Sequence, residues 1–369
     1  MAAYIVRRLL LMIPTLFGIM VVNFIVVQFA PGGPVEQLVA QITGSDEGAT
    51  SGIGGAEGEL GGAMDGLGAA AGTAVNEYRG AQGLDPAFIE ELEKQFGFDR
   101  PLYERFLLMM GNFIKFDFGH SYFRDETVVD LVIAKMPVSI SLGLWTTLIV
   151  YLVSIPLGIR KAVHDGSTFD VWTSALVIVG YAIPGFLFAI ILIVLFAGGS
   201  FLDWFPLRGL TSENWELMSW PARILDYFWH LVLPITALVI HGFATLTFLT
   251  KNSFLDQIHL LYVSTARAKG LTEARVLYGH VFRNAMLIVI AGFPSAFIHI
   301  LFTGALLIEI IFSLDGLGLL GFEAVVKRDY PVMFATLYFF TLLGLVLHLI
   351  GDVIYTIVDP RIDFEARNA

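Results

Sequence analysis

The chain has 369 residues, of which 56% are hydrophobic and only 15% are charged, and its mean hydropathy is +0.74. Soluble domains carry about 25% charged residues, so this composition excludes an ordinary soluble protein and predicts one that has lipid as its solvent. The absence of cysteine excludes disulfides and thiolate metal sites. The net charge of −11 argues against nucleic acid as a partner, although in a membrane protein the distribution of charge across the two faces matters more.

Six apolar stretches are long enough to cross a bilayer, whose hydrocarbon core of about 30 Å needs roughly 20 residues of helix. They are residues 9–29, 138–159, 171–197, 228–250, 285–312 and 332–358. Each of the first five contains one proline, which fits a packed, kinked bundle around an internal path and equally fits simple tolerance of proline. The sequence therefore predicts an all-α membrane protein with six transmembrane helices.

The basic residues indicate which side of the membrane the termini face. An even number of spans places both termini on one side, together with segments 160–168 and 251–284. That side holds eleven of the 22 basic residues in roughly 60 positions, while the other eleven are spread over roughly 155 positions. Because basic residues gather in cytoplasmic loops, we expect both termini and these two segments to be cytoplasmic.

The segments outside the later spans differ in composition. We expect residues 1–34 to form a retained transmembrane helix, because its apolar run exceeds the roughly 7 to 15 residues of a signal peptide. Residues 35–137 are predicted to be a periplasmic insertion. Within it, 43–73 is rich in Gly and Ala and has low expected order, whereas 85–135 is predicted to be a small helical subdomain that starts at an Asp85 cap. Residues 138–358 hold the other five helices, and 359–369 form a cytoplasmic tail.

Motifs for catalysis are absent from the sequence. No lysine is followed by Ser or Thr, which excludes a Walker phosphate loop, and no two of the eight histidines stand four apart, which excludes an H-E-x-x-H zinc helix. Gly316, Gly318 and Gly321 match G-x-G-x-x-G, but they follow a span without βαβ context, so we interpret them as turn or re-entrant backbone. We expect no catalytic residue, no metal site and no cofactor in this chain.

Two acidic residues, Glu309 and Asp352, lie inside predicted spans. A charge within a span is costly and marks a functional hypothesis. Both residues lie within a turn or two of a span end, Glu309 on the external side and Asp352 on the cytoplasmic side. Helix capping or snorkelling therefore explains them as well as contact with a transport pathway or a second subunit does.

The cytoplasmic segment 251–284 is long, basic and periodic enough to form two helices. The first is predicted to end at Gly270 as a glycine C-cap, and Thr272 can cap a second helix that runs into the membrane. The predicted apolar face of the first helix consists of Ile258, Leu261, Tyr262 and Thr265.

Small and basic residues alternate at the end of that first helix. Ala266, Ala268 and Gly270 leave room for a partner's backbone to approach closely. Arg267 and Lys269 offer donors to the carboxylates or carbonyls of a partner. We interpret the segment as a docking element, and the alternative is a basic loop that only sets the orientation of the protein.

The sequence T-A-R-A-K-G-L at 265–271 resembles the ATPase-coupling loop of type I ABC importer permeases. Ser264, Thr265, Ala266 and Gly270 stand at the E-A-A-x-x-x-G positions of that loop, and only Ala266 and Gly270 match the general pattern. This departure is typical of the oligopeptide and dipeptide permease branch. The chain shares with that branch H-x-x-R-N-A at 280–285, G-L-G at 316–318, R-D-Y-P-V at 328–332 and D-P-R-I at 359–362. Within the branch it is most similar to Yej-type B permeases.

The resemblance implies the MetI/OppB-like architecture, in which 138–358 is the ABC transmembrane domain and 251–284 is the coupling loop. It also implies a multi-pass protein of the bacterial inner membrane. The implied coupling residues are Val263, Ser264, Thr265, Ala266, Arg267, Ala268, Lys269, Gly270, Leu271, Thr272 and Glu273.

The resemblance further implies a permease subunit that moves peptides from periplasm to cytoplasm, among them oligopeptides, microcin C-like peptides and murein-derived peptides. The implied partners are a homologous second permease, ATP-binding-cassette ATPases that bind ATP and Mg²⁺, and a periplasmic peptide-binding protein. The alternative is a secondary transporter or channel that works without an ATPase, although the sequence shows no convincing internal repeat. An intramembrane enzyme is disfavoured because Glu309 and Asp352 are predicted near opposite faces.

Overall fold

The computed structural model describes residues 2–29, 33–35, 38, 94, 97–197, 201–302 and 306–358. Regular structure in these residues is helical, apart from one isolated β-bridge between His120 and Thr127. The chain forms two compact units, which we call the large unit (1–16, 133–320 and 339–369) and the small unit (17–132 and 321–338).

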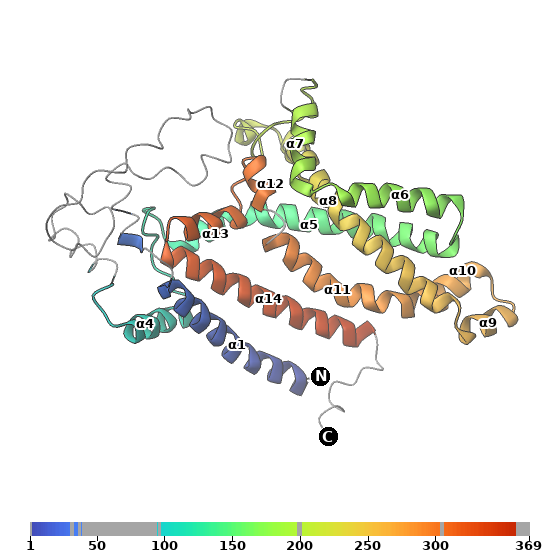
Figure 1. The fold of residues 1–369 in the computed structure, drawn as a ribbon, viewed down its shortest axis with the longest axis horizontal. Helices are drawn as coiled ribbons and strands as arrows, with labels where there is room; N and C mark the ends of the chain where they lie inside the picture. Colours follow the sequence, from blue (N-terminus) through green and yellow to red (C-terminus); the bar gives the residue numbers. More distant parts are fainter. Residues whose placement is uncertain are drawn as a thin grey trace, which may run out of the picture. The chain divides into compact units, whose positions relative to one another are not determined.

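The helices follow one another along the chain as Figure 1 labels them. All are α-helices except η1, which is a 3₁₀ turn, and η2, which is a π-helical turn. In order they are α1 (Ala2–Phe29), α4 (Leu102–Ile114), α5 (Val128–Val163), α6 (Thr168–Ala182), α7 (Gly185–Phe196), η1 (Trp215–Leu217), α8 (Trp220–Ile258), α9 (Leu261–Ala268), α10 (Glu273–Val276), η2 (Leu277–Val281), α11 (Phe282–Phe302), α12 (Leu306–Ile311), α13 (Leu317–Val326) and α14 (Tyr330–Val358).

The candidate membrane spans agree with the predicted number. Five helical stretches in the described part of the chain are long and apolar enough to cross a bilayer: Tyr4–Phe29, Val128–Val163, Trp220–Ile258, Glu273–Pro294 and Tyr330–Ile354. The bent pair α6 and α7 passes the same test as a sixth span. The predicted fold class, an all-α protein with six spans, is therefore confirmed.

The third span is not the single helix that the sequence predicted over 171–197. It breaks at Ile183, and α6 and α7 meet at an angle of 91°. Ile183 has φ −84° and ψ 120°, the extended backbone that a residue before proline prefers, and Pro184 cannot donate to the preceding turn. The prolines in α1, α5, α8 and α11 stay inside their helices, so proline alone did not locate the break.

Other predicted spans also differ at their ends, and α8 (Trp220–Ile258) extends beyond the predicted 228–250 on both sides. Helix α5 begins at Val128, ten residues before the predicted start at 138, so the last part of the predicted external subdomain belongs to a span helix. Segment 285–312 is described as α11 up to Phe302 and as α12 from Leu306, and residues 303–305 lie outside the described residues. The Gly-rich segment 43–73 and the helix expected to start at Asp85 lie outside the described residues, so these domain assignments stay predictions.

Helix α8 is central to the large unit, where it packs against α6, α7 and α11. One buried cluster joins α5, α7, α8 and α12 and includes Leu142 and Leu231, which are 0% and 1% exposed. A second cluster joins the far end of α8 to α9, η2 and α11, with Phe254 and Val263 both fully buried. Figure 1 shows α9 and α10 at the C-terminal end of α8. This second cluster holds the predicted coupling segment in place.

Candidate functional site: a coupling surface and three buried polar sites

Helix α9 is the predicted coupling helix, and it presents one face to solvent. Val263 and Ala266 point inward, with exposed fractions of 0% and 6%, and they pack with Val276 and Val281. Ser264 and the other residues between 264 and 270, except Ala266, are exposed. Because Ala266 packs within the chain, the small residues that a partner can reach are Ala268 and Gly270.

The predicted apolar face of this segment is wrong. Helix α8 ends at Ile258, and the chain turns at His259 and Leu260 before α9 begins, so the periodicity does not continue across the turn. Leu261 is consequently 85% exposed and Thr265 is also exposed.

Gly270 ends α9 as predicted. Its φ is +79°, and its N–H lies 2.9 Å from the carbonyl oxygen of Arg267. A residue with a side chain is strained at this φ, whereas glycine adopts it readily. A Cβ placed on Gly270 would meet no atom within 4 Å, so the chain itself has room for a side chain there. Thr272 stands at the N-cap position of α10, as predicted, although its side chain makes no capping hydrogen bond, and α10 and η2 lead into α11.

Arg267 is paired within the chain and is only partly free to meet a partner. Its Nε lies 3.0 Å from Glu273 Oε1, and both side chains are well exposed. A surface ion pair of this kind contributes roughly 0–1 kcal/mol, so a partner's carboxylate can replace Glu273 at small cost. Next to it, a cavity of about 600 Å³ opens between the ends of α5 and α8 and α10, with Leu255 and Tyr278 in its wall. Helix α9 and this cavity together form the candidate coupling surface.

A buried lysine at the end of α5 is a site that the sequence analysis missed. Lys161 is fully buried, and its Nζ lies 3.0 Å from Asp170 Oδ1. The ammonium also donates to the carbonyl oxygen of Asp170 at 2.8 Å, to Thr173 Oγ1 at 2.8 Å and to Ser174 Oγ at 2.7 Å. All three ammonium hydrogens thus have acceptors, which a buried charge requires.

A second lysine joins this pair from α8. Lys251 Nζ lies 2.7 Å from Asp170 Oδ2 and 2.7 Å from Asp165 Oδ1. The N–H of Gly166 donates to the same Asp170 carboxylate at 3.1 Å. The network therefore ties the α5–α6 connection to the end of α8, and these two segments lie on one side of the large unit, as the distribution of basic residues predicted. The residues of this network from α5 and α6 stand close together in the sequence, in R-K-A-V-H-D-G-S-T-F-D at 160–170. From this segment we predicted only the side of the membrane that it faces.

Glu309 is fully buried, and it caps a helix other than its own. Its Oε2 accepts the N–H of Leu319 at 2.7 Å, and Ser139 Oγ donates to Oε1 at 3.3 Å. Ser139 Oγ in turn accepts the N–H of Leu317 at 2.8 Å. These N–H groups belong to the first turn of α13, where a negative charge is favourable. The carboxylate thus has partners within the chain, as the capping alternative requires, and contact of Glu309 with a pathway or a second subunit stays a prediction.

The glycines of G-L-G leave the room that this carboxylate occupies. A Cβ on Gly316 would overlap the Glu309 carboxylate, and a Cβ on Gly318 would lie 3.0 Å from Oε2. Gly316 and Gly318 thus form the start of α13, packed against the Glu309 carboxylate, and the re-entrant interpretation stays a prediction.

We expect Gly316→Ala to destabilise the protein by about 1–3 kcal/mol, the cost of overpacking a filled site. Gly344→Ala in α14 is the control, because a Cβ there meets nothing within 4 Å. The melting temperature in detergent measures both variants. A melting temperature of Gly316→Ala equal to that of the wild-type protein contradicts the assignment.

Asp352 joins α14 to α1 within the large unit. Its Oδ2 accepts a hydrogen bond from the Tyr4 hydroxyl at 2.9 Å and forms an ion pair with Arg8 at 2.8 Å. The Asp352 side chain is 29% exposed. The predicted role in a pathway or an interface stays a prediction, and the structure adds a partner within the chain.

In the small unit, Asp329 organises the turn before α14. It accepts hydrogen bonds from Ser121 Oγ and, at 3.1 Å, from the N–H of Tyr122. Burial raises the pKa of the Asp329 carboxyl above its ordinary value, although these two hydrogen bonds act in the opposite direction. Arg124 forms an ion pair with Glu323, in which Nη2 lies 2.7 Å from Oε2. The R-D-Y-P-V motif therefore serves the packing of this unit.

Comparison with known proteins gives the family. The family of binding-protein-dependent transport system inner membrane components matches residues 154–364. The peptidoglycan transport system permease protein YejB of Agrobacterium fabrum is 63% identical over 368 residues, and the inner membrane ABC transporter permease protein YejB of Escherichia coli O157:H7 is 59% identical over 367 residues. Both alignments cover 100% of each chain. The oligopeptide transport system permease protein AppB of Bacillus subtilis is 34% identical over 99% of this chain and 100% of its own. This chain therefore belongs to the binding-protein-dependent transport system inner membrane component family, as a multi-pass permease of the inner membrane.

Proposed function

We propose that the chain is the permease subunit of an ABC importer that carries peptides, including peptidoglycan-derived peptides, from the periplasm to the cytoplasm. The observation that carries this proposal is the full-length, 63% identity to a permease of a peptidoglycan transport system. The 34% identity to an oligopeptide permease supports the broader class of peptide cargo. Peptides of the microcin C type belong to the same proposal as a further substrate class.

Helix α9 is the proposed contact with the ATPase. It is short, its outer face is exposed, and its inner face packs on the ends of α8 and α11 through Val263 and Ala266. When the ATPase pair closes on ATP, a push on α9 is transmitted to these spans as a displacement of packed, rigid elements. ATP and Mg²⁺ are bound by the ATPase subunits, and this chain supplies the lever.

The further partners are a homologous second permease and a periplasmic peptide-binding protein. The described helices leave large apolar side chains exposed on α1, α5, α6 and α8, for example Leu10 at 61% and Leu176 at 74%. Lipid and a second permease are the environments that cover such surfaces in a membrane. The binding protein would deliver the peptide on the face opposite α9.

Uptake in a host that lacks this chain tests the proposed substrate class. A strain with the gene removed should fail to accumulate a labelled peptidoglycan-derived tripeptide or tetrapeptide, and the plasmid-borne chain should restore accumulation. An uptake that continues after ATP depletion, with the ion gradients kept, would instead favour a secondary transporter.

A further inference from the structure

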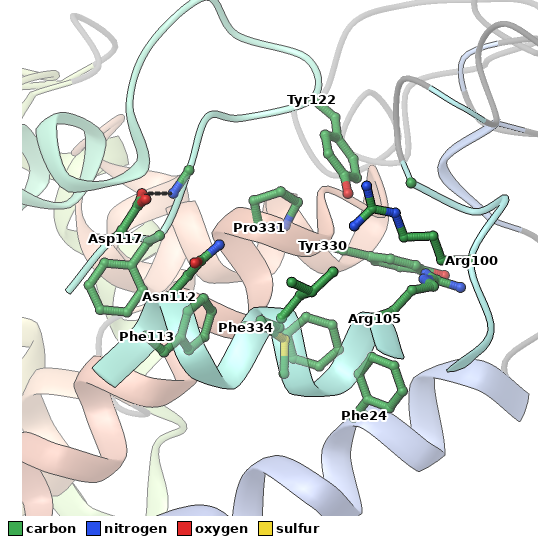
Figure 2. Close-up of a pocket in the computed structure, with 15 residues that line it drawn as sticks. Phe24, Arg100, Arg105, Asn112, Phe113, Asp117, Tyr122, Tyr330, Pro331 and Phe334 are labelled. Carbon is green, nitrogen blue, oxygen red and sulfur yellow. Dashed lines mark hydrogen bonds between the residues drawn. The ribbon is translucent and has the colours of Figure 1, made fainter. Parts of the chain in front are cut away.

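The small unit contains a cavity of about 290 Å³, which we call the Arg105 pocket. Its walls are α4, the residues Gly97 and Arg100 before it, the segment 117–122, α1 at Phe24 and the first turns of α14 (Figure 2). In Figure 2 the side chains of Arg100 and Arg105 lie at one end with the rings of Tyr122 and Tyr330, and Phe24 lies beside them. Ligand pockets start at about 300 Å³, so the cavity suits a small polar group and not a whole peptide.

In the part of the chain that the structure describes, neither arginine is found in an ion pair with a carboxylate. The Arg105 guanidinium lies 4.0 Å from the centroid of the Phe98 ring, which holds it by a cation–π contact. Burial lowers the pKa of Arg105, because the half-buried charge has lost part of its hydration. The acid in the wall, Asp117, lies at the other end of the pocket in Figure 2 and accepts the N–H of Gly119 at 3.1 Å. An anion next to Arg100 and Arg105 would supply the missing counter-charge.

Two residues of the pocket wall, Phe24 and Tyr330, lie near the ends of candidate spans. The candidate span Tyr4–Phe29 ends five residues after Phe24, and the candidate span Tyr330–Ile354 begins at Tyr330. Tyrosine is enriched where a span meets the headgroup layer, and arginine side chains near span ends reach toward that layer.

Helix α4 carries an unburied apolar face next to the pocket. Tyr103, Leu107 and Ile114 are 71%, 62% and 72% exposed, and their spacing of four and seven places them on one side of the helix. Phe113 is buried, and so is Met110, although Met110 lies on the same side of the helix as Tyr103 and Leu107. Apolar side chains that stay exposed on a helix next to candidate membrane spans can be covered by lipid at the membrane surface. The lipids that surround α4 are therefore within reach of the pocket.

We propose that the Arg105 pocket binds the phosphate of an anionic phospholipid headgroup. Arg100 and Arg105 present planar guanidinium donors, whose geometry matches phosphate oxygens. Phe24 and Phe334 offer an apolar surface to the upper part of the acyl chains. The bound lipid would contact α4, α1 at Phe24 and the first turns of α14 at the same time, and so stabilise their packing inside the small unit.

Native mass spectrometry of the purified full chain tests the proposal after exchange into nanodiscs that contain equal amounts of phosphatidylglycerol and phosphatidylcholine. The wild-type protein should retain phosphatidylglycerol in preference to phosphatidylcholine. Arg105→Gln should weaken the retention of phosphatidylglycerol about tenfold. Arg100→Gln is the second variant, and it should also weaken the retention of phosphatidylglycerol. Because Arg100 is exposed, its substitution should leave the stability of the fold unchanged. Lys115→Gln is the matched control, because it removes an exposed positive charge from the end of α4 outside the pocket.

Three results would overturn the proposal. Equal retention of both lipids by the wild-type protein removes the selectivity for an anion. An equal loss in Lys115→Gln and both arginine variants shows that only general surface charge attracts the lipid. Displacement of the lipid by inorganic phosphate at the same concentration shows a site for free phosphate and no use of the acyl chains.

Discussion

Gly270→Asp should abolish ATP-dependent peptide uptake while the protein remains folded in the membrane. Gly270 is exposed at the end of α9, and a Cβ there would meet no atom of the chain within 4 Å. The side chain therefore fits the isolated chain, and its φ of +79° is one that Asp tolerates better than most residues. The aspartate side chain would keep a partner from approaching α9 closely. It would also place a negative charge next to Arg267 and Lys269, which are the positive charges of this surface. We expect uptake to fall at least about tenfold, a loss of about 1.4 kcal/mol or more in coupling.

A pair of asparagine variants separates docking from backbone strain. Gly166, in the connection between α5 and α6, also has a positive φ of +72° and open space around its Cβ position. Gly166→Asn and Gly270→Asn therefore carry the same side chain on the same backbone conformation, and only the second alters α9. Normal uptake by Gly166→Asn with impaired uptake by Gly270→Asn supports docking at α9. Equal uptake by these two variants, with normal transport by Gly270→Asp, would falsify the role of Gly270.

Asp170→Ala should cost the folded protein about 3–5 kcal/mol, the largest stability effect that we expect from a single substitution. The change removes the carboxylate that faces two ammonium groups, Lys161 at 3.0 Å and Lys251 at 2.7 Å. Lys161 has no exposed surface, so its charge would stay buried without a counter-charge. The melting temperature of the purified protein in a mild detergent measures the loss.

Asp165→Ala is the matched control for this variant. Asp165 pairs with the same Lys251 at the same 2.7 Å, but its side chain is 54% exposed, so its loss should cost at most about 1 kcal/mol. Adding Lys161→Met to Asp170→Ala should recover part of the stability, because the unpaired buried ammonium is then absent. Equal melting temperatures of the two alanine variants would show that burial of the network contributes nothing.

Much of the fold follows from the sequence because membrane spans are specified by local composition. Length and hydropathy located the spans, and the Gly270 C-cap was predicted because a helix that meets an exposed glycine can end there in a left-handed turn. The break at Pro184 was not predicted. Pro14, Pro156, Pro234 and Pro294 have the same chemistry and stay within helices, so the outcome depends on packing.

The polar sites were harder to predict because their partners are distant in the sequence. Glu309 was recognised as a costly charge, but its partners are the N–H of Leu319 and a hydroxyl 170 positions earlier, Ser139. The Lys161 network was missed because its basic residues also satisfy the rule for cytoplasmic loops, and this rule needs no acidic partner. The sequence shows that such charged residues are present, whereas their hydrogen-bond and ion-pair partners are determined by tertiary packing.

Site-directed cross-linking from α9 tests the coupling account most directly, because the natural chain has no cysteine and one can be placed without background. Ser264 is exposed on α9, and Glu213 is exposed in the segment before α8 that is predicted to face the periplasm. With the transporter assembled in its native membrane, Ser264→Cys should cross-link to an ATPase subunit, with a yield that changes when ATP is added, and Glu213→Cys should not. The absence of any ATPase adduct from Ser264→Cys, in membranes where the second permease and the ATPase are present, would contradict the account.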